Sequence, residues 1–308
     1  MSRMPEAEWS KRLRKSLVLD LIDTVDPTEY LRRLEYEPYP WQVFTLDRIK
    51  RGCTRVHING ARQSGKSTVT AGVPAYVSKT ERALSLIYAP SDDQSKDDIE
   101  RVKDFIRRDV SYPQLVLDSI EHIKLPNGSY VRAHTSTAKT KRGKSMPRVI
   151  VFDEAAYIDD VLYKTVRPML TENPRCVVIA LSTPNGRDGW FYRASESERW
   201  LRIVVKAPWD LNEYRELIPA EPEKQFRKRM AEKGIHGFYS PRHRDKDFML
   251  EELEEHGERW FRQEYLCEYV EPEDVVFDYD QIDRMFGNPI KGDESDEGVL
   301  ISPHVESL

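Results

Sequence analysis

The residues best suited to chemistry lie in a glycine-rich run at positions 60–67, which reads Gly-Ala-Arg-Gln-Ser-Gly-Lys-Ser. Its spacing matches the phosphate-binding pattern G-x-x-x-x-G-K-S/T, and the strand-like segment 55–59 precedes it. Backbone amides can bind phosphate oxygens here, Lys66 can reach the β- and γ-phosphates, and Ser67 can bind Mg²⁺. A chance glycine turn is the alternative, but the flanking strand and helix patterns argue against it. We therefore predict that ATP is bound by Gly60, Ala61, Arg62, Gln63, Ser64, Gly65, Lys66, Ser67 and Thr68.

A pair of acidic residues ends a second apolar run, residues 149–152, where Asp153 and Glu154 follow directly. Asp153 is predicted to bind Mg²⁺, and Glu154 to orient and polarise the water that attacks the γ-phosphate. By itself, an apolar strand that ends in two acids is as often an ordinary strand end as a site. Together with the glycine-rich run, the pair favours a nucleotide hydrolase whose catalytic residues include Lys66 and Glu154.

Two further positions carry polar side chains that could contact the nucleotide. Ser182 and Thr183 follow the apolar run 176–181, and ligands bind at the carboxyl ends of strands in open α/β sheets. They could sense the γ-phosphate, although a hydroxyl-rich turn before proline explains them equally well. Gln42 could pair with both the donor and the acceptor edge of adenine. A capped helix start with a buried tryptophan is the simpler explanation of the run 39–42.

Basic residues cluster at 139–144, 227–229 and 242–246. Most such clusters are solvated faces. The first directly precedes the strand that ends in Asp153, so a basic loop there could meet a phosphate or DNA. The formal net charge is −5, so any contact with nucleic acid must come from a local patch of this kind.

The composition is that of a folded globular protein. The 308 residues are 39% hydrophobic and 33% charged, enough for one large α/β domain or two modest ones. The three cysteines are far apart and lack metal-ligand spacing, which favours a reducing compartment. No apolar stretch approaches the ~20 residues that span a bilayer, so we expect a soluble protein with no membrane partner.

Short strand-like runs alternate with helical segments from residue 55 onward, which predicts a parallel sheet covered by helices. The predicted strands are 55–59, 84–89, 149–152, 176–181 and 201–205, with a hairpin of 120–125 and 130–134. The predicted helices are 7–25, 41–52, 221–233 and 251–265. The fold class is therefore α/β: a P-loop NTPase with a mainly parallel central sheet flanked by helices, plus a small helical lid subdomain.

Changes in pattern along the chain predict its domain boundaries. After residue 208 the strand pattern stops and charged, helix-rich segments follow. The last residues are acidic and poor in large apolar side chains. We predict an N-terminal helical segment, a P-loop ATPase core, a lid or linker subdomain and a disordered acidic tail, at 1–33, 34–208, 209–286 and 287–308.

Taken together, these motifs resemble the large terminase family of tailed viruses over residues 34–286. Each motif by itself is shared with helicases and other ATPases, whereas the combination is specific. The resemblance rests on Pro40-Trp41-Gln42, the P-loop with its internal arginine, Arg142-Gly143 before Asp153-Glu154, Ser182-Thr183-Pro184, and the run 262–269.

The resemblance implies the ATPase motor of a terminase, which hydrolyses ATP with Mg²⁺ and pumps double-stranded DNA through a portal protein into a viral shell. It also implies a homo-oligomeric ring on the portal, a small terminase subunit as partner, and assembly in the host cytoplasm. Gln42 would contact adenine, and Ser182 and Thr183 would couple hydrolysis to movement. A catalytic arginine would be Arg62 within the subunit or Arg142 from a neighbour.

Members of this family usually continue into a nuclease domain. After residue 286 the sequence offers no strands to hold separated acidic metal ligands, so we expect no nuclease activity and a separate nuclease polypeptide. A superfamily 2 helicase is one rival interpretation, but residues 209–308 show no second α/β lobe. A DNA-binding scaffold that only binds ATP is the other, and Glu154 argues against it.

Overall fold

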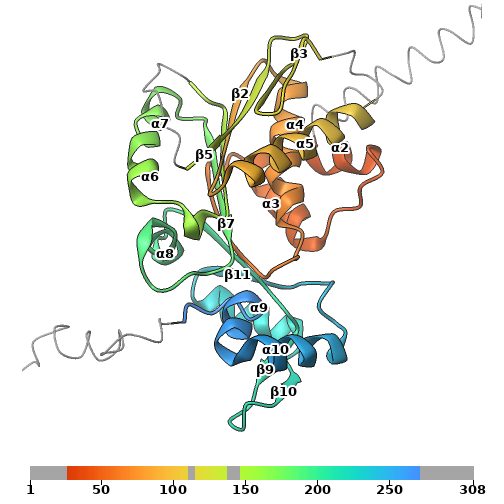
Figure 1. Ribbon diagram of the computed structural model, residues 1–308, viewed down its shortest axis with the longest axis vertical. Coiled ribbons are helices and arrows are strands. Elements are labelled where there is room, and N and C mark those ends of the chain that lie inside the picture. The colour runs from red at the N-terminus through yellow and green to blue at the C-terminus, as the bar shows by residue number, and fades with distance from the viewer. Residues whose placement is uncertain (1–25, 110–114, 137–145, 271–308) are drawn as a thin grey trace, which may run out of the picture. The chain divides into compact units, whose positions relative to one another are not determined.

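The computed structural model describes residues 26–109, 115–136 and 146–270, all within one unit, Met1–Val270 (Figure 1). Several predictions lie outside the described residues. They are the helix at 7–25, the basic run 139–144 with Arg142, and the acidic tail at 287–308.

Nine strands of the described residues form one sheet in the order β11-β8-β1-β7-β6-β2-β5-β4-β3. From β11 to β5 the neighbouring strands run parallel, and β4 and β3 extend the sheet antiparallel beyond β5. The strands are β1 (Arg55–Gly60), β2 (Leu84–Ala89), β3 (Leu117–Asp118), β4 (His122–Lys124), β5 (Tyr130–Thr135), β6 (Val149–Asp153), β7 (Val177–Ser182), β8 (Leu201–Lys206) and β11 (Ile235–Tyr239).

The central strands are buried on both faces, because helices cover the sheet from both sides. Their sequences are therefore continuous apolar runs, Val-Ile-Val-Phe-Asp in β6 and Val-Val-Ile-Ala-Leu-Ser in β7, in which every residue is buried. The five strands predicted between residues 55 and 205 are all present. The predicted hairpin is also present as β4 and β5, joined by a turn in which Gly128 has φ +86°.

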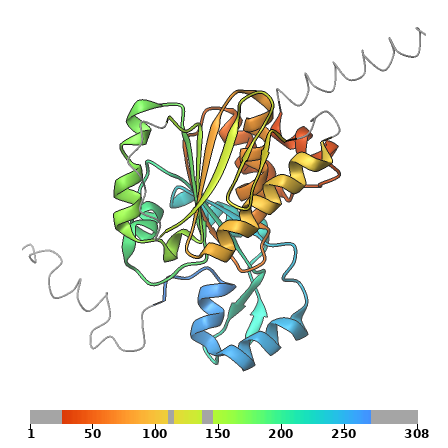
Figure 2. The same ribbon diagram turned by 45° about the horizontal axis from the view of Figure 1, so that its top comes forward.

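Figure 2 shows the two helical layers on either side of the sheet. One layer holds α2 (Pro27–Arg33), α3 (Pro40–Lys50), α4 (Lys66–Thr80) and α5 (Asp92–Arg108), which pack through Leu31, Trp41, Val69 and Ile99. The other holds the short helix η1 (Ala155–Tyr157) with α6 (Asp160–Val166), α7 (Met169–Glu172) and α8 (Gly189–Glu196), packed around Leu162 and Trp190.

The segment after residue 208 differs from the prediction. The helices α9 (Glu223–Glu232) and α10 (Lys246–Glu264) are present, but so is a small sheet of β9 (Trp209–Leu211) and β10 (Leu217–Pro219). The expectation that strands end at residue 208 is wrong, because β11 joins the central sheet beside β8. The sequence of β11, Ile-His-Gly-Phe-Tyr, does not predict a strand, because Gly237 interrupts the apolar pattern. A glycine is required there, since a Cβ at this position would lie 2.8 Å from the Phe226 ring.

A third apolar cluster, separate from those on the two sheet faces, packs the end of α10 against the segment that follows β8. It includes Ala207, Leu217, Met249, Phe261 and Tyr265. The division of the chain at residue 208 remains a prediction. Among the described helices, none combines the length and apolar character that a membrane-crossing segment requires.

Candidate nucleotide-binding site

The glycine-rich run forms the loop between β1 and α4, as its motif predicts. Gly65 has φ +94°, a left-handed conformation that favours glycine, and α4 begins at the next residue. The Lys66 side chain is buried and turns back over the loop, where its Nζ donates to the carbonyl oxygens of Gly60 (2.9 Å) and Ala61 (3.3 Å). The loop thus places an ammonium group at the amino end of a helix, an arrangement suited to binding phosphate.

Two buried side chains from the start of α3 support this loop. Trp41 donates its Nε1–H to the Ser64 carbonyl oxygen (3.2 Å), and Gln42 donates from Nε2 to the Gly65 carbonyl oxygen (2.9 Å). The Gln42 Oε1 accepts from the Tyr39 backbone N–H at 2.7 Å. Both ends of the Gln42 amide therefore contact backbone, as the capped-helix explanation expects. The contact of Gln42 with adenine remains a prediction.

Asp153 ends β6 and lies next to the first turns of α4. Its Oδ1 accepts from the Thr70 hydroxyl at 3.3 Å, and its side chain is buried. Burial, followed by the nearby Glu154 carboxylate, raises the pKa of Asp153 to about 6. A cation bound at this place would offset both effects, because it would favour the charged carboxylate.

Glu154 is held between the P-loop and β7. Its Oε1 lies 3.7 Å from Lys66 Nζ, and its Oε2 accepts from the Ser182 hydroxyl at 2.9 Å. Its backbone has φ 45°, a left-handed conformation that costs a non-glycine residue about 1–3 kcal/mol and recurs at functional sites. The structure therefore brings together Lys66, Glu154 and Ser182, which the sequence singled out separately.

The end of α10 contacts the same loop from the opposite side. The Arg62 backbone N–H donates to the Glu264 carbonyl oxygen (2.8 Å), and the Thr183 hydroxyl donates to Glu264 Oε1 (3.2 Å). The Arg62 guanidinium lies 5.8 Å from the centre of the Trp260 ring, within the range of a cation–π contact. The hydrogen bond of Thr183 thus links the end of β7 to the end of α10.

A cavity of about 920 Å³ opens over these residues, a volume in the range of nucleotide and cofactor sites. Its lining contains most of the predicted site, from the P-loop and from the ends of β6 and β7. The lining residues are Tyr36, Arg62, Gln63, Gly65, Lys66, Ser67, Thr68, Pro90, Gln94, Glu154, Tyr157, Thr183, Arg242, Trp260, Gln263 and Glu264.

The sequence did not assign several of these lining residues. The sequence places Arg242 in a basic cluster of the kind that is usually a solvated face, yet Arg242 lines the cavity and donates from Nε to the Tyr39 hydroxyl at 2.8 Å. Trp260, Gln263 and Glu264 lie in or next to the run that carried the family resemblance, which is the only signal that could have identified them. Such residues carry no local motif, because they reach the site through tertiary packing.

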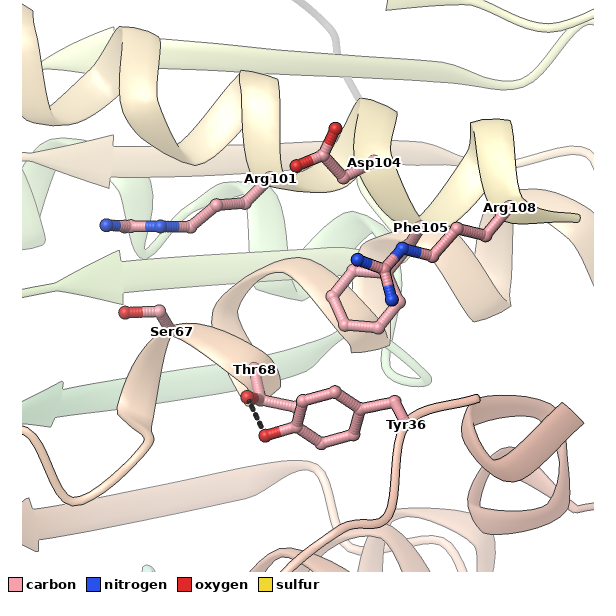
Figure 3. Close-up of a pocket in the computed structure, with 7 residues that line it drawn as sticks. All are labelled: Tyr36, Ser67, Thr68, Arg101, Asp104, Phe105 and Arg108. Atoms are coloured by element: carbon pink, nitrogen blue, oxygen red, sulfur yellow. Dashed lines mark hydrogen bonds between the residues drawn. The ribbon is translucent and has the colours of Figure 1, made fainter. Parts of the chain in front are cut away.

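A smaller cavity of about 190 Å³ lies beside the first turn of α4 (Figure 3). Tyr36 closes one side of it, and its hydroxyl is 2.6 Å from the Thr68 hydroxyl. Ser67 shares this cavity with four residues of α5, a helix to which the sequence assigned no role: Arg101, Asp104, Phe105 and Arg108.

Ser67 and Asp153 suit Mg²⁺ only together with a nucleotide. No group of three or more His, Cys, Asp and Glu side chains within residues 26–109, 115–136 and 146–270 is arranged to hold a metal ion. Mg²⁺ in phosphate-transfer sites takes one or two protein oxygens and completes its shell with phosphate oxygens and water. One hydroxyl and one carboxylate therefore match that pattern.

No protein-family model matches this sequence, and no curated protein matches it. Solved structures with a similar fold include large terminases of phages. The ATPase domain of the Thermus phage P74-26 large terminase is 20% identical with TM-score 0.56, and the match covers 80% of this chain and 99% of that domain. A mutant of that domain gives 19% identity and TM-score 0.59, with 80% and 100% covered.

The large terminase of bacteriophage HK97 is 16% identical with TM-score 0.55, and the match covers 75% of this chain but 50% of the HK97 protein. At such identities the likeness establishes the fold. The chain thus has the fold of terminase ATPase domains, with a large, mostly parallel sheet flanked by helices, and the predicted fold class is confirmed.

Proposed function

We propose that this chain is the ATPase motor of a phage large terminase, which hydrolyses ATP with Mg²⁺ and uses the energy to move double-stranded DNA. One observation carries the proposal: the P-loop lysine after β1 and the acid after β6, two strands away in the sheet, meet at one nucleotide-sized cavity. Lys66, Ser67 and Glu154 line that cavity, and Asp153 ends β6 directly before Glu154.

In this proposal, the Lys66 ammonium exchanges its bonds to the P-loop carbonyls for bonds to the β- and γ-phosphates. Mg²⁺, held by Ser67 and Asp153, would neutralise charge on the transferred phosphoryl group. Glu154 would align the attacking water, and Ser182 would fix the carboxylate through its hydrogen bond. Thr183 would report the state of the phosphates to α10 through Glu264.

The proposal includes partners: a portal protein, a small terminase subunit and neighbouring copies in a ring. A subunit needs a further positive charge near the γ-phosphate, and two arginines are candidates. Arg62 lines the cavity, which supports action within its own subunit. Arg142 lies outside the described residues and would act on a neighbour.

The test is ATP hydrolysis by the purified chain, measured with and without double-stranded DNA. Glu154→Gln keeps the shape of the side chain but removes the carboxylate, so the variant should bind ATP and lose about 10²–10⁴-fold in turnover. Its residual rate also controls for contaminating ATPases. If the parent chain binds ATP but hydrolyses it no faster than the Glu154→Gln variant, the result would instead favour a DNA-binding scaffold that only binds ATP.

Mixing experiments test the ring. If Arg142 acts across a subunit boundary, Arg142→Ala chains mixed with Glu154→Gln chains should recover part of the turnover, because some interfaces pair an intact arginine with an intact glutamate. A mixture that assembles, as sedimentation would show, but stays inactive would favour Arg62.

A further inference from the structure

Trp41 and Gln42, at the start of α3, contact the P-loop through its backbone. Both side chains are fully buried, and neither is among the described residues that line the large cavity. The Gln42 amide is bonded at both ends, to the Gly65 carbonyl oxygen and to the Tyr39 backbone N–H. To contact a bound adenine directly, Gln42 would have to break these two hydrogen bonds.

The bonds from α3 fix the directions of two peptide groups in the loop. Trp41 donates to the Ser64 carbonyl oxygen at 3.2 Å, and Gln42 donates to the next carbonyl oxygen along the loop at 2.9 Å. In a trans peptide group, the C=O of one residue and the N–H of the next point in opposite directions. Holding these oxygens against α3 therefore turns the N–H groups of Gly65 and Lys66 away from α3. Both of these residues line the large cavity.

The two N–H groups that this arrangement directs are suited to bind phosphate. Within the described residues, neither the Gly65 nor the Lys66 backbone N–H donates to another group of the protein. Consecutive N–H groups at the amino end of a helix form the anion-binding part of a P-loop. α3 packs directly against them, because a Cβ at Gly65 would lie 2.9 Å from the Gln42 Nε2 and 3.2 Å from the Tyr39 ring.

We propose that Trp41 and Gln42 are positioning residues for phosphate: they hold two peptide groups of the P-loop so that the N–H groups point at the phosphate chain of a bound nucleotide. This inference rests on the proposed function and deepens it, because it makes the contribution of Gln42 independent of the base. α3 then supports the binding of any nucleoside diphosphate or triphosphate equally. A glutamine that reads adenine would instead favour adenine nucleotides alone.

The test measures the dissociation constants of ADP, GDP and inorganic pyrophosphate for the full chain and for three variants of it. Gln42→Met keeps the length of the side chain but removes its hydrogen bonds, and Trp41→Phe keeps a buried ring but removes the Nε1–H donor. Thr45→Val is the matched control. Thr45 is also fully buried on α3, but its hydroxyl donates within the helix, to the Trp41 carbonyl oxygen at 2.8 Å, rather than to the loop.

Gln42→Met should weaken the binding of all three probes by the same factor, about tenfold, because a well-placed hydrogen bond contributes roughly that much. Trp41→Phe, which loses the longer of the two bonds to the loop, should weaken all three by about threefold. Thr45→Val should leave the three dissociation constants unchanged, even where it lowers the melting temperature.

Amide proton resonances provide a second measurement, which a purely structural role would not affect. In the parent chain, the amide protons of Gly65 and Lys66 should shift downfield when they bond to pyrophosphate. Gln42→Met should reduce this shift at Lys66, because it releases the peptide group that carries that N–H. Trp41→Phe should reduce the shift at Gly65 for the same reason.

If Gln42→Met weakened ADP binding alone and left GDP and pyrophosphate binding as in the parent chain, Gln42 would contact adenine and the inference would be overturned. Unchanged binding of all three probes by folded Gln42→Met and Trp41→Phe chains would also overturn it. If Gln42→Met does not fold, Trp41→Phe decides, and failure of both variants to fold would assign a purely structural role. A parent chain that binds the probes but does not hydrolyse ATP would refute the proposed function and leave this inference standing.

Discussion

The two walls of the large cavity are built in different ways. The P-loop wall consists of consecutive residues at 60–68, whose positions follow from one turn and from two supporting side chains of α3. The opposite wall comes from residues almost two hundred positions later, Arg242 after β11 and Trp260 with Glu264 on α10. Glu154 and Thr183, at the ends of β6 and β7, lie beside the P-loop residues and are counted with their wall. This wall carries the groups that act on phosphate, and the second closes the site around them.

Few contacts join these walls, so each can be tested separately. The links are the Arg62 N–H to the Glu264 carbonyl oxygen, the Arg62 guanidinium over Trp260, and the hydroxyl of Thr183 to the Glu264 carboxylate. We expect changes in the P-loop wall to reduce the rate of hydrolysis, and changes in the α10 wall to reduce nucleotide affinity.

The largest effect is expected at Lys66. Lys66→Ala deletes the ammonium that stabilises charge on the phosphates, so kcat should fall by about 10²–10³-fold or more. Lys66→Arg, which keeps the charge but not the shape, controls for loss of charge alone. Because Lys66 also bonds to the Gly60 and Ala61 carbonyls, a melting curve must show that the variant is folded. Near-parental turnover in a folded Lys66→Ala chain would contradict the role of the P-loop wall.

An intermediate effect is expected at Ser182, which holds the Glu154 carboxylate at 2.9 Å. A hydrogen bond to a charged group is worth about 1.5–3 kcal/mol, so Ser182→Ala should lower kcat at least about tenfold with little change in ATP affinity. The adjacent Thr183→Val removes the bond to Glu264 instead and should mainly raise the KM for ATP. If both substitutions lowered kcat equally, the expectation that the two walls serve separate functions would be contradicted.

The smallest effect is expected at Arg242, in the α10 wall. Its guanidinium lines the cavity and is anchored on the Tyr39 hydroxyl, so Arg242→Ala should weaken ATP binding by about 1 kcal/mol, roughly fivefold, at nearly constant kcat. Arg244→Ala is the control, because Arg244 is exposed in the same basic cluster and is not among the residues that line the cavity. If Arg242→Ala lowered kcat without weakening ATP binding, Arg242 would act in hydrolysis, as the P-loop wall does, and not in binding.

Local sequence patterns predicted the P-loop, the acid pair and most of the sheet. A P-loop binds phosphate through consecutive backbone amides and one lysine, so the spacing of these residues in the sequence is enough to predict the function. Strands β6 and β7 were predicted because strands covered on both faces are apolar runs. Strands β1, β2 and β8 were predicted from short β-rich runs between helical segments. Strand β11, which the sequence did not predict, carries a glycine where the Phe226 ring approaches closely, and the sequence does not reveal that contact.

By itself, then, the sequence determined the phosphate-binding loop, the acids Asp153 and Glu154 at one strand end, and the α/β class of the fold. Only the tertiary structure decided that Ser182 holds Glu154, that Gln42 supports the P-loop from behind, and that Arg242 and α10 close the cavity. The physical reason is the separation along the chain of the residues that interact. Hydrogen bonds along one loop depend on spacing within a few residues, whereas side chains from distant elements meet only after the apolar cores have fixed the relative positions of those elements.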